Sequence, residues 1–153
     1  MIKLESGGRL FHIDERFEGL NKRIIYRIRN DFDNSYVGYS ASSRGRIKAH
    51  LYNLGARQRD LSSIFGNAKI ATVKPTKKFN YIKSKDIKEW YIDIMDIDCG
   101  EEDFPLREGL RLYEEVMLGK KVINSVVPPG FRRTPYVSIS QYDEKVGFYD
   151  NNR

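Results

Sequence analysis

The chain has 153 residues, of which 40% are hydrophobic, so it is long enough to bury one core and we expect a single domain over residues 1–153. Lysines and arginines number 27 against 21 aspartates and glutamates, and the formal net charge of +6 favours an anionic partner, with nucleic acid as the leading candidate. The single cysteine excludes an internal disulfide, and the lack of a long apolar run or a secretory N-terminus predicts a soluble, intracellular, cytoplasmic protein without a membrane partner.

The N-terminal region leads into a predicted hairpin. Residues 1–21 contain a Gly7-Gly8 pair and an alternating stretch at 10–13, which indicates either an added strand or a flexible arm. Tyr26 lies in an alternating run, residues 30–34 have the composition of a turn, and residues 35–40 resume a strand pattern that includes Tyr36. We therefore predict a β-hairpin that carries both tyrosines.

A basic segment follows the hairpin. If residues 43–54 are helical, Arg46 and His50 project from one face because they are four residues apart. Cations without intervening acids, followed by a lysine-rich stretch with interleaved aromatic residues, are typical of a surface that binds the nucleic-acid backbone, and a solvated basic face is the alternative interpretation. The candidates for nucleic-acid binding are Arg44, Lys48, Arg57, Arg59, Lys77 and Lys78.

The C-terminal half predicts a third strand and a second helix. Residues 90–97 are rich in β-forming residues, and an acidic loop then precedes Pro105, which opens a helix that ends near Gly119. An apolar stripe at helical spacing predicts the side of this helix that faces the core, with charged residues opposite. The stripe consists of Leu106, Leu110, Tyr113 and Met117, and the charged side of Arg107, Arg111, Glu114 and Glu115.

Two triplets in the hairpin carry a family resemblance. Ile24-Ile25-Tyr26 and Tyr36-Val37-Gly38, with Arg46 eight residues after Gly38 and His50 four residues later, resemble the GIY-YIG nuclease family in order and spacing. The chain departs from the family pattern at Ile24, where the family has glycine, and keeps the tyrosine. Without the arginine and the histidine, ordinary cross-strand packing of two tyrosines would be the better explanation of the hairpin.

The resemblance covers residues 22–124 as a catalytic core, with residues 1–21 and 125–153 as extensions. It implies that Glu108, early in the helix after the third strand, binds the metal ion, and that Asn124 corresponds to the family's closing asparagine and binds nucleic acid. Three other acids compete with Glu108 for the metal. These rivals are Glu102, Glu114 and Glu115.

The resemblance also implies roles for the remaining residues. Tyr26 would be the general base if neighbouring cations such as Arg46 lower the pKa of its phenol below the usual value of about 10. Tyr36 would position the attacking water or the phosphate, and Arg46 would clamp the phosphate through paired hydrogen bonds. His50 would relay a proton or bind phosphate, or else be a histidine that packs the helix. Glu108 would hold Mg²⁺, with Mn²⁺ as a substitute.

We therefore expect an α/β fold with a small mixed or antiparallel three-stranded sheet flanked by helices, as in GIY-YIG nucleases. The expected function is Mg²⁺-dependent cleavage of DNA by a stand-alone nuclease of homing or restriction type. A nucleic-acid-binding protein that has lost catalysis and a domain that binds a protein partner are the alternatives. A homodimer would permit concerted cleavage of both strands, and no sequence signal indicates one.

Overall fold

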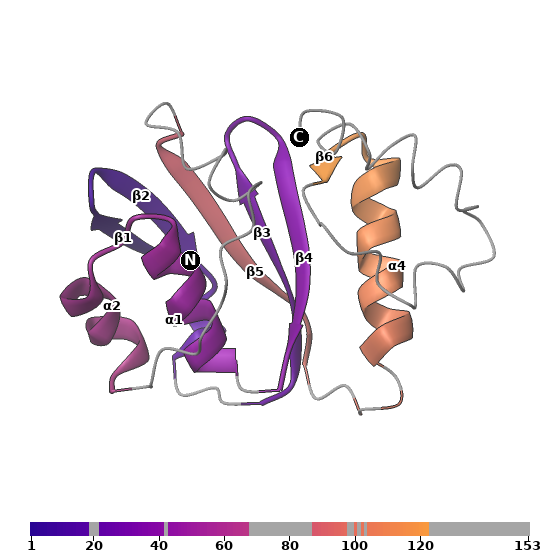
Figure 1. Cartoon of the computed structure of the whole chain (residues 1–153), viewed down its shortest axis with the longest axis horizontal. Coiled ribbons are helices and arrows are strands. Elements are labelled where there is room, and N and C mark those ends of the chain that lie inside the picture. The colour runs from indigo at the N-terminus through magenta and orange to yellow at the C-terminus, as the bar shows by residue number, and fades with distance from the viewer. Residues whose placement is uncertain are drawn as a thin grey trace.

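The computed structural model describes residues 1–18, 22–41, 43–67, 87–97 and 104–122, together with Gly100 and Glu102. Within these ranges one mixed sheet has the strand order β1-β2-β5-β3-β4-β6 (Figure 1). The strands are β1 (Ile2–Ser6), β2 (Arg9–Ile13), β3 (Ile24–Asn30), β4 (Asn34–Ser40), β5 (Glu89–Ile97) and β6 (Lys121–Val122). The helices are a 3-10 turn, η1 (Glu15–Phe17), and α1 (Ser43–Asn53), α2 (Gln58–Phe65) and α4 (Phe104–Met117). The α/β class is confirmed, whereas the prediction of only three strands is wrong.

The hairpin β3–β4 forms where the sequence predicts it. Its strands pair antiparallel, and Tyr26 and Tyr36 lie on the same face of neighbouring strands. The side-chain oxygen of Asn30 accepts a hydrogen bond of 3.2 Å from the backbone N–H of Asn34 and so closes the turn. Asp33 has a positive φ of 62° in this turn, a conformation that aspartate tolerates better than most residues. Local turn chemistry therefore fixes the register that brings the tyrosines together.

The N-terminal residues extend the sheet beyond the predicted core boundary at residue 22. β1 and β2 pair antiparallel, and β2 pairs in parallel with β5, where Leu10 lies opposite Glu89. Phe11 and Ile13 of β2 are fully buried in the core. Of the two interpretations of residues 10–13, the added strand is therefore confirmed.

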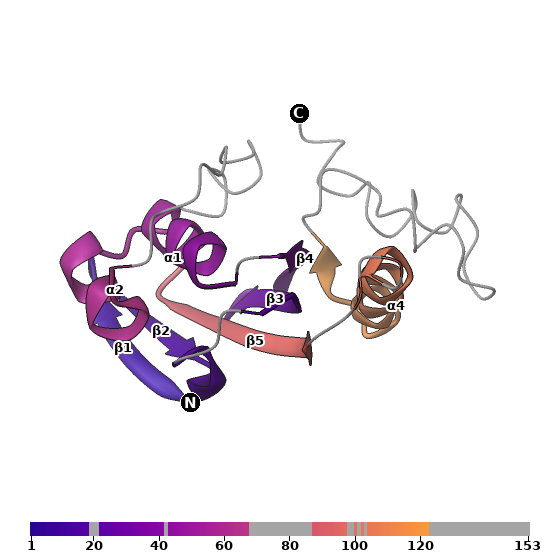
Figure 2. The ribbon, with the colours of Figure 1, turned by 90° about the horizontal axis from the view of Figure 1, so that it is seen from below.

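Alternation along the strands divides the apolar side chains between two faces of the sheet. α1 and α2 pack on the face that carries Tyr26 and Trp90, where the larger hydrophobic cluster lies. On the opposite face, Leu112 and Val116 of α4 pack against Ile25 of β3 and Val37 of β4. Figure 2 shows α1 and α2 on one side of the sheet and α4 beyond β4. None of the helices in the described ranges is both long enough and apolar enough to cross a membrane.

α4 matches the predicted second helix in extent, but it is rotated about its axis relative to the prediction. Leu106 and Met117 are 43% and 63% exposed, whereas Leu112 and Val116 are buried. Tyr113 packs against the smaller hydrophobic cluster. The prediction that the stripe containing Leu106 and Met117 faces the core is therefore wrong.

A buried acid explains this rotation. Glu115, which the sequence placed on the charged outer side, is 1% exposed. It accepts a hydrogen bond of 2.7 Å from the Ser35 hydroxyl and one of 3.3 Å from Arg27, which also pairs with Asp93 at 3.1 Å. A buried carboxylate is tolerated only when it is paired. α4 therefore turns Glu115 toward the strands that supply its partners.

Candidate active site

Three aromatic side chains from three elements meet on the face of the sheet that α1 covers. Tyr26 comes from β3, Tyr36 from β4 and His50 from α1, and we call them the tyrosine–histidine centre. The Tyr26 hydroxyl lies 2.7 Å from Nε2 of His50, and the ring centroids of the three pairs are 5.4 to 6.1 Å apart. Tyr26 and His50 are 1% and 3% exposed, and Tyr36 is partly buried. Three residues that the sequence predicted are thus in mutual contact.

Gly38 makes the position of the Tyr26 ring sterically possible. The two residues are opposite each other in the hairpin. A Cβ atom at Gly38 would lie 2.5 Å from the Tyr26 hydroxyl oxygen and 2.9 Å from the Tyr36 ring. Gly38 is not among the glycines with positive φ, so the requirement is for space and not for an unusual backbone conformation. Gly38 had no predicted functional role, although its place in the second triplet was a signal.

Burial raises the pKa of Tyr26 well above its ordinary value of 10.0, and it raises the pKa of Tyr36 as well. The positive charge of Arg46 lowers the pKa of both phenols, while the negative charge of Glu108 raises both. The expectation that Arg46 brings the pKa of Tyr26 below 10 is therefore wrong, because burial outweighs the nearby cation.

The same electrostatic effects locate Arg46 and Glu108. Arg46 lies on α1, one turn before His50, and Glu108 lies on α4. Charges on two different helices influence both phenols only if they lie near the tyrosine–histidine centre. The structure brings Tyr26, Tyr36 and His50 into contact, and Arg46 and Glu108 lie near enough for their charges to act on both phenols.

His50 is neutral at ordinary pH. Burial and then the charge of Arg46 lower its pKa from 6.5 to about 3. A neutral imidazole supplies no positive charge for a phosphate, but its Nε2 can accept a hydrogen bond from the Tyr26 hydroxyl. Of the roles that the sequence left open for His50, this geometry favours proton relay and packing over phosphate binding.

This pKa predicts how stability depends on pH. Below pH 6.5 the unfolded chain binds a proton at His50 that the folded protein does not bind until about pH 3. The free energy of unfolding should therefore fall as the pH decreases from 6.5 toward 3, by up to about 1.4 kcal/mol per pH unit from this residue. Urea unfolding of wild type and His50→Gln at several pH values in this window measures the effect. The substitution should flatten the slope, and parallel slopes would contradict the prediction.

Two contacts, one before and one after Glu108 in the sequence, hold the first two turns of α4 against the sheet. The Phe104 ring stacks on Tyr39 of β4, with centroids 3.8 Å apart. Arg111 forms two hydrogen bonds with the Asp96 carboxylate of β5, at 2.8 and 3.1 Å. The sequence indicated Arg111 only as part of the charged side of the helix and gave no role to Tyr39, Asp96 or Phe104, because a stack or an ion pair between distant segments leaves no local pattern. They place Glu108 beside β4.

Glu108 differs from its three rivals in its surroundings. It is partly buried, and burial raises its pKa from 4.5 to about 7. Glu115 is bound to Arg27, Glu114 is exposed and paired with Arg111, and Glu102 is exposed. No group of three or more His, Cys, Asp or Glu side chains suited to a metal ion occurs within the described residues. Glu108 is therefore the acid best placed to act with the tyrosine–histidine centre.

No family model, no curated protein sequence and no solved structure matched this chain.

The predicted nucleic-acid-binding residues have different surroundings. Arg57 and Arg59 are exposed, and Arg44 is partly buried. Lys48 is 2% exposed, and its ammonium donates a hydrogen bond of 3.0 Å to the carbonyl of Gly66 at the end of α2. A buried cation that binds the C-terminal end of a helix stabilises that helix, so the structure does not support phosphate binding by Lys48. Three further predicted residues lie outside the described residues, namely Lys77, Lys78 and Asn124.

Proposed function

We propose that this protein is a Mg²⁺-dependent endonuclease that hydrolyses phosphodiester bonds in DNA, of the homing or restriction type suggested by its resemblance to GIY-YIG nucleases. The observation that carries the proposal is the convergence of a hydrogen-bonded Tyr26–His50 pair with Arg46 and Glu108 from separate helices. Phosphodiester hydrolysis needs an oriented water, a proton acceptor and neutralisation of charge on the phosphate. The site contains a group suited to each need.

Arg46 is the group that binds the scissile phosphate. Its guanidinium carries a fixed positive charge and can donate two parallel hydrogen bonds to phosphate oxygens. Because it stands near both phenols, a phosphate bound to it would lie next to the hydroxyls of Tyr26 and Tyr36. Tyr36, which is only partly buried, then orients the attacking water.

The proton leaves the water through Tyr26 and His50. As the water oxygen attacks phosphorus and the bond to the 3′ oxygen breaks, the Tyr26 oxygen receives a proton from the water and passes its own proton to Nε2 of His50. A concerted transfer avoids a phenolate, which burial strongly disfavours. The imidazolium that results is stabilised by the negative charge of the reacting phosphate, and the leaving 3′ oxygen takes a proton from solvent.

Glu108 is the residue that would hold a metal ion. One carboxylate suffices for Mg²⁺, which keeps several waters and takes phosphate oxygens as further ligands, and Mn²⁺ accepts the same oxygen donors. The partly buried carboxylate near two phenols fits this donor set. When bound, the ion supplies a Lewis acid for the charge that develops on the leaving 3′ oxygen.

Plasmid cleavage tests the proposal. Wild type should cut supercoiled DNA in Mg²⁺ and not in EDTA, and Arg46→Ala should lower the rate by about 10²–10³-fold, as loss of a preorganised donor does in other enzymes. Arg46→Lys keeps the charge without the planar fork and should retain part of the rate. Lys3→Ala, which removes an exposed cation on β1, is the control for charge and should cut at the wild-type rate. Wild type that never cuts DNA would refute the nuclease.

A nucleic-acid-binding protein without catalysis is the second candidate. The observation that favours it is the raised pKa of Tyr26, because a general base is most effective when its pKa lies near the working pH. Such a protein would bind DNA with a steep dependence on salt and would leave plasmid intact with every divalent metal.

A further inference from the structure

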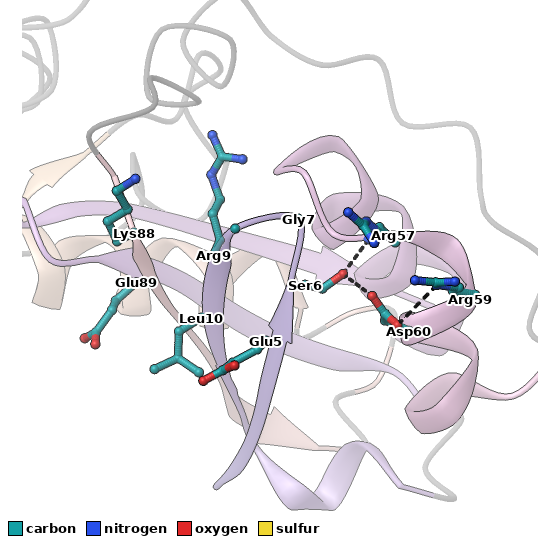
Figure 3. Close-up of a pocket in the computed structure, with 11 residues that line it drawn as sticks. Glu5, Ser6, Gly7, Arg9, Leu10, Arg57, Arg59, Asp60, Lys88 and Glu89 are labelled. Carbon is teal, nitrogen blue, oxygen red and sulfur yellow. Dashed lines mark hydrogen bonds and ion pairs between the residues drawn. The ribbon is translucent and has the colours of Figure 1, made fainter.

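A second site, lined by several basic residues, lies at the far end of the sheet from the tyrosine–histidine centre. A pocket of about 640 Å³ is formed between the β1–β2 turn, the start of α2 and the start of β5 (Figure 3). This volume is within the range of about 300–1,000 Å³ typical of sites for small ligands. Four cations and three acids line the pocket, and the sides to which these side chains point determine the charge of each side of the pocket. The cations are Arg9, Arg57, Arg59 and Lys88, and the acids are Glu5, Asp60 and Glu89.

Strand alternation separates most of these charges. Residues two apart on a strand share a face of the sheet. Arg9 and Lys88 come two residues before Phe11 and Trp90, so they lie on the face that α1 and α2 cover. Glu5 and Glu89 occupy the opposite positions. Figure 3 shows the side chains of Arg9 and Lys88 on one side of the strands and those of Glu5 and Glu89 on the other. The side of the pocket that faces the helices is therefore predominantly positive.

The third acid is already engaged by neighbouring groups. The Ser6 hydroxyl donates a hydrogen bond of 2.7 Å to Asp60 and accepts one of 2.7 Å from the backbone N–H of Arg57. Arg59 lies 3.8 Å from the same carboxylate. Within the described ranges, the side chains of Arg57 and Lys88 have no ion-pair partner and both residues are exposed. Ser6 thus fixes the start of α2 in a position that leaves the Arg57 guanidinium available.

Two features of the wall keep the pocket accessible and its shape fixed. The β1–β2 turn consists of Gly7 and Gly8, both with positive φ, and a Cβ atom at Gly8 would meet no other atom within 4 Å. The Arg9 guanidinium packs so closely on Gly55 that any side chain there would overlap it. The Arg9 guanidinium therefore lies against the backbone at Gly55, while the turn leaves open space at Gly8.

We propose that this pocket binds a backbone phosphate of the nucleic-acid substrate at a point remote from the cut, through Arg57 and Lys88 with Arg9 as a further positive charge. Ile94 of β5 lies opposite Tyr26, and Lys88 comes six residues before Ile94. At 3.3 Å per residue, Lys88 is therefore about 20 Å from Ile94 along the strand. Both sites lie on the face of the sheet that α1 and α2 cover. Binding at two separated points orients a duplex relative to the tyrosine–histidine centre. This inference rests on the proposed function, because it takes DNA as the substrate.

The salt dependence of DNA binding tests the inference. Fluorescence anisotropy with a long labelled duplex in EDTA, between about 50 and 200 mM salt, gives the slope of log K against log salt, which changes by about 0.9 for each phosphate contact. The double variant Arg57→Ala/Lys88→Ala should lower this slope by about 0.9, because the pocket binds one phosphate. Lys3→Ala removes a cation on the same hairpin outside the pocket and should keep the wild-type slope. Thermal unfolding of each variant checks that the fold is intact.

The outcomes separate this inference from the proposed function. A double variant that keeps the wild-type slope overturns the pocket, even if wild type cuts plasmid in Mg²⁺. A slope that depends on the pocket in a protein that never cuts would refute the nuclease and support the pocket. If inorganic phosphate binds wild type and not the double variant while the DNA slope is unchanged, the pocket takes a free anion and the inference is wrong.

Discussion

Replacing Glu108 with glutamine is expected to lower Mg²⁺-dependent DNA cleavage by about 10³-fold or more. A metal ion contributes several kcal/mol to stabilising charge in the transition state, and each 1.36 kcal/mol corresponds to about tenfold in rate. Glutamine keeps the size of the side chain but has no negative charge with which to hold the ion. Because burial disfavours the ionised carboxylate, the neutral amide should not reduce stability, so unfolding cannot explain the loss. Plasmid cleavage and calorimetric titration of Mg²⁺ measure both effects.

Glu114→Gln provides the matched control. Glu114 lies on the same helix, is exposed and pairs with Arg111, so its loss should change neither cleavage nor Mg²⁺ binding. The assignment of Glu108 would fail if Glu108→Gln cut normally. If Glu102→Gln then lost activity instead, the metal ligand would be Glu102.

Replacing Glu115 with alanine is expected to destabilise the fold by about 3–5 kcal/mol, the usual effect of removing one partner from a buried ion pair. The substitution leaves the Ser35 hydroxyl without its acceptor and Arg27 with only Asp93 as a charged partner among the described residues. It also creates a cavity between α4 and β3. The free energy of unfolding in urea measures the loss, which is a large fraction of the stability of a domain of this size.

Glu114→Ala again serves as the control, because an exposed ion pair contributes about 0–1 kcal/mol. A loss at Glu115 no larger than at Glu114 would contradict the burial of Glu115. The double variant Arg27→Met/Glu115→Leu removes both charges and should recover part of the stability, since apolar residues of similar volume often replace a buried ion pair without net cost.

Sequence patterns predicted the parts of the site that depend on local chemistry. The Asn30 turn and the alternation around it predicted the hairpin, and the spacing of four residues placed Arg46 and His50 on one face of α1. α2 was missed because it has only eight residues and Arg57 at its N-cap makes no side-chain hydrogen bond. The apolar positions Leu61, Ile64 and Phe65, at helical spacing, were the available signal.

Properties that depend on tertiary contacts were not predictable from the pattern. Glu115 looks like a solvent-facing acid in the sequence, and only its contact with Arg27 reveals that it is buried. Lys48 likewise looks like one cation in a basic run, but the end of α2 encloses it. The high pKa of Tyr26 arises because α1 covers its ring, which reverses the effect expected from Arg46 alone.

The strand order has a consequence for how the chain folds. β5 lies between the hairpins β1–β2 and β3–β4 and forms hydrogen bonds with both, although it follows both of them in the chain. Each hairpin can form early from local contacts, within microseconds in isolated examples. The two hairpins are joined only through β5, so in a nascent chain that ends before Glu89 the edges of β2 and β3 that β5 later covers are open. Insertion of β5 is therefore the step of high contact order that should limit the folding rate.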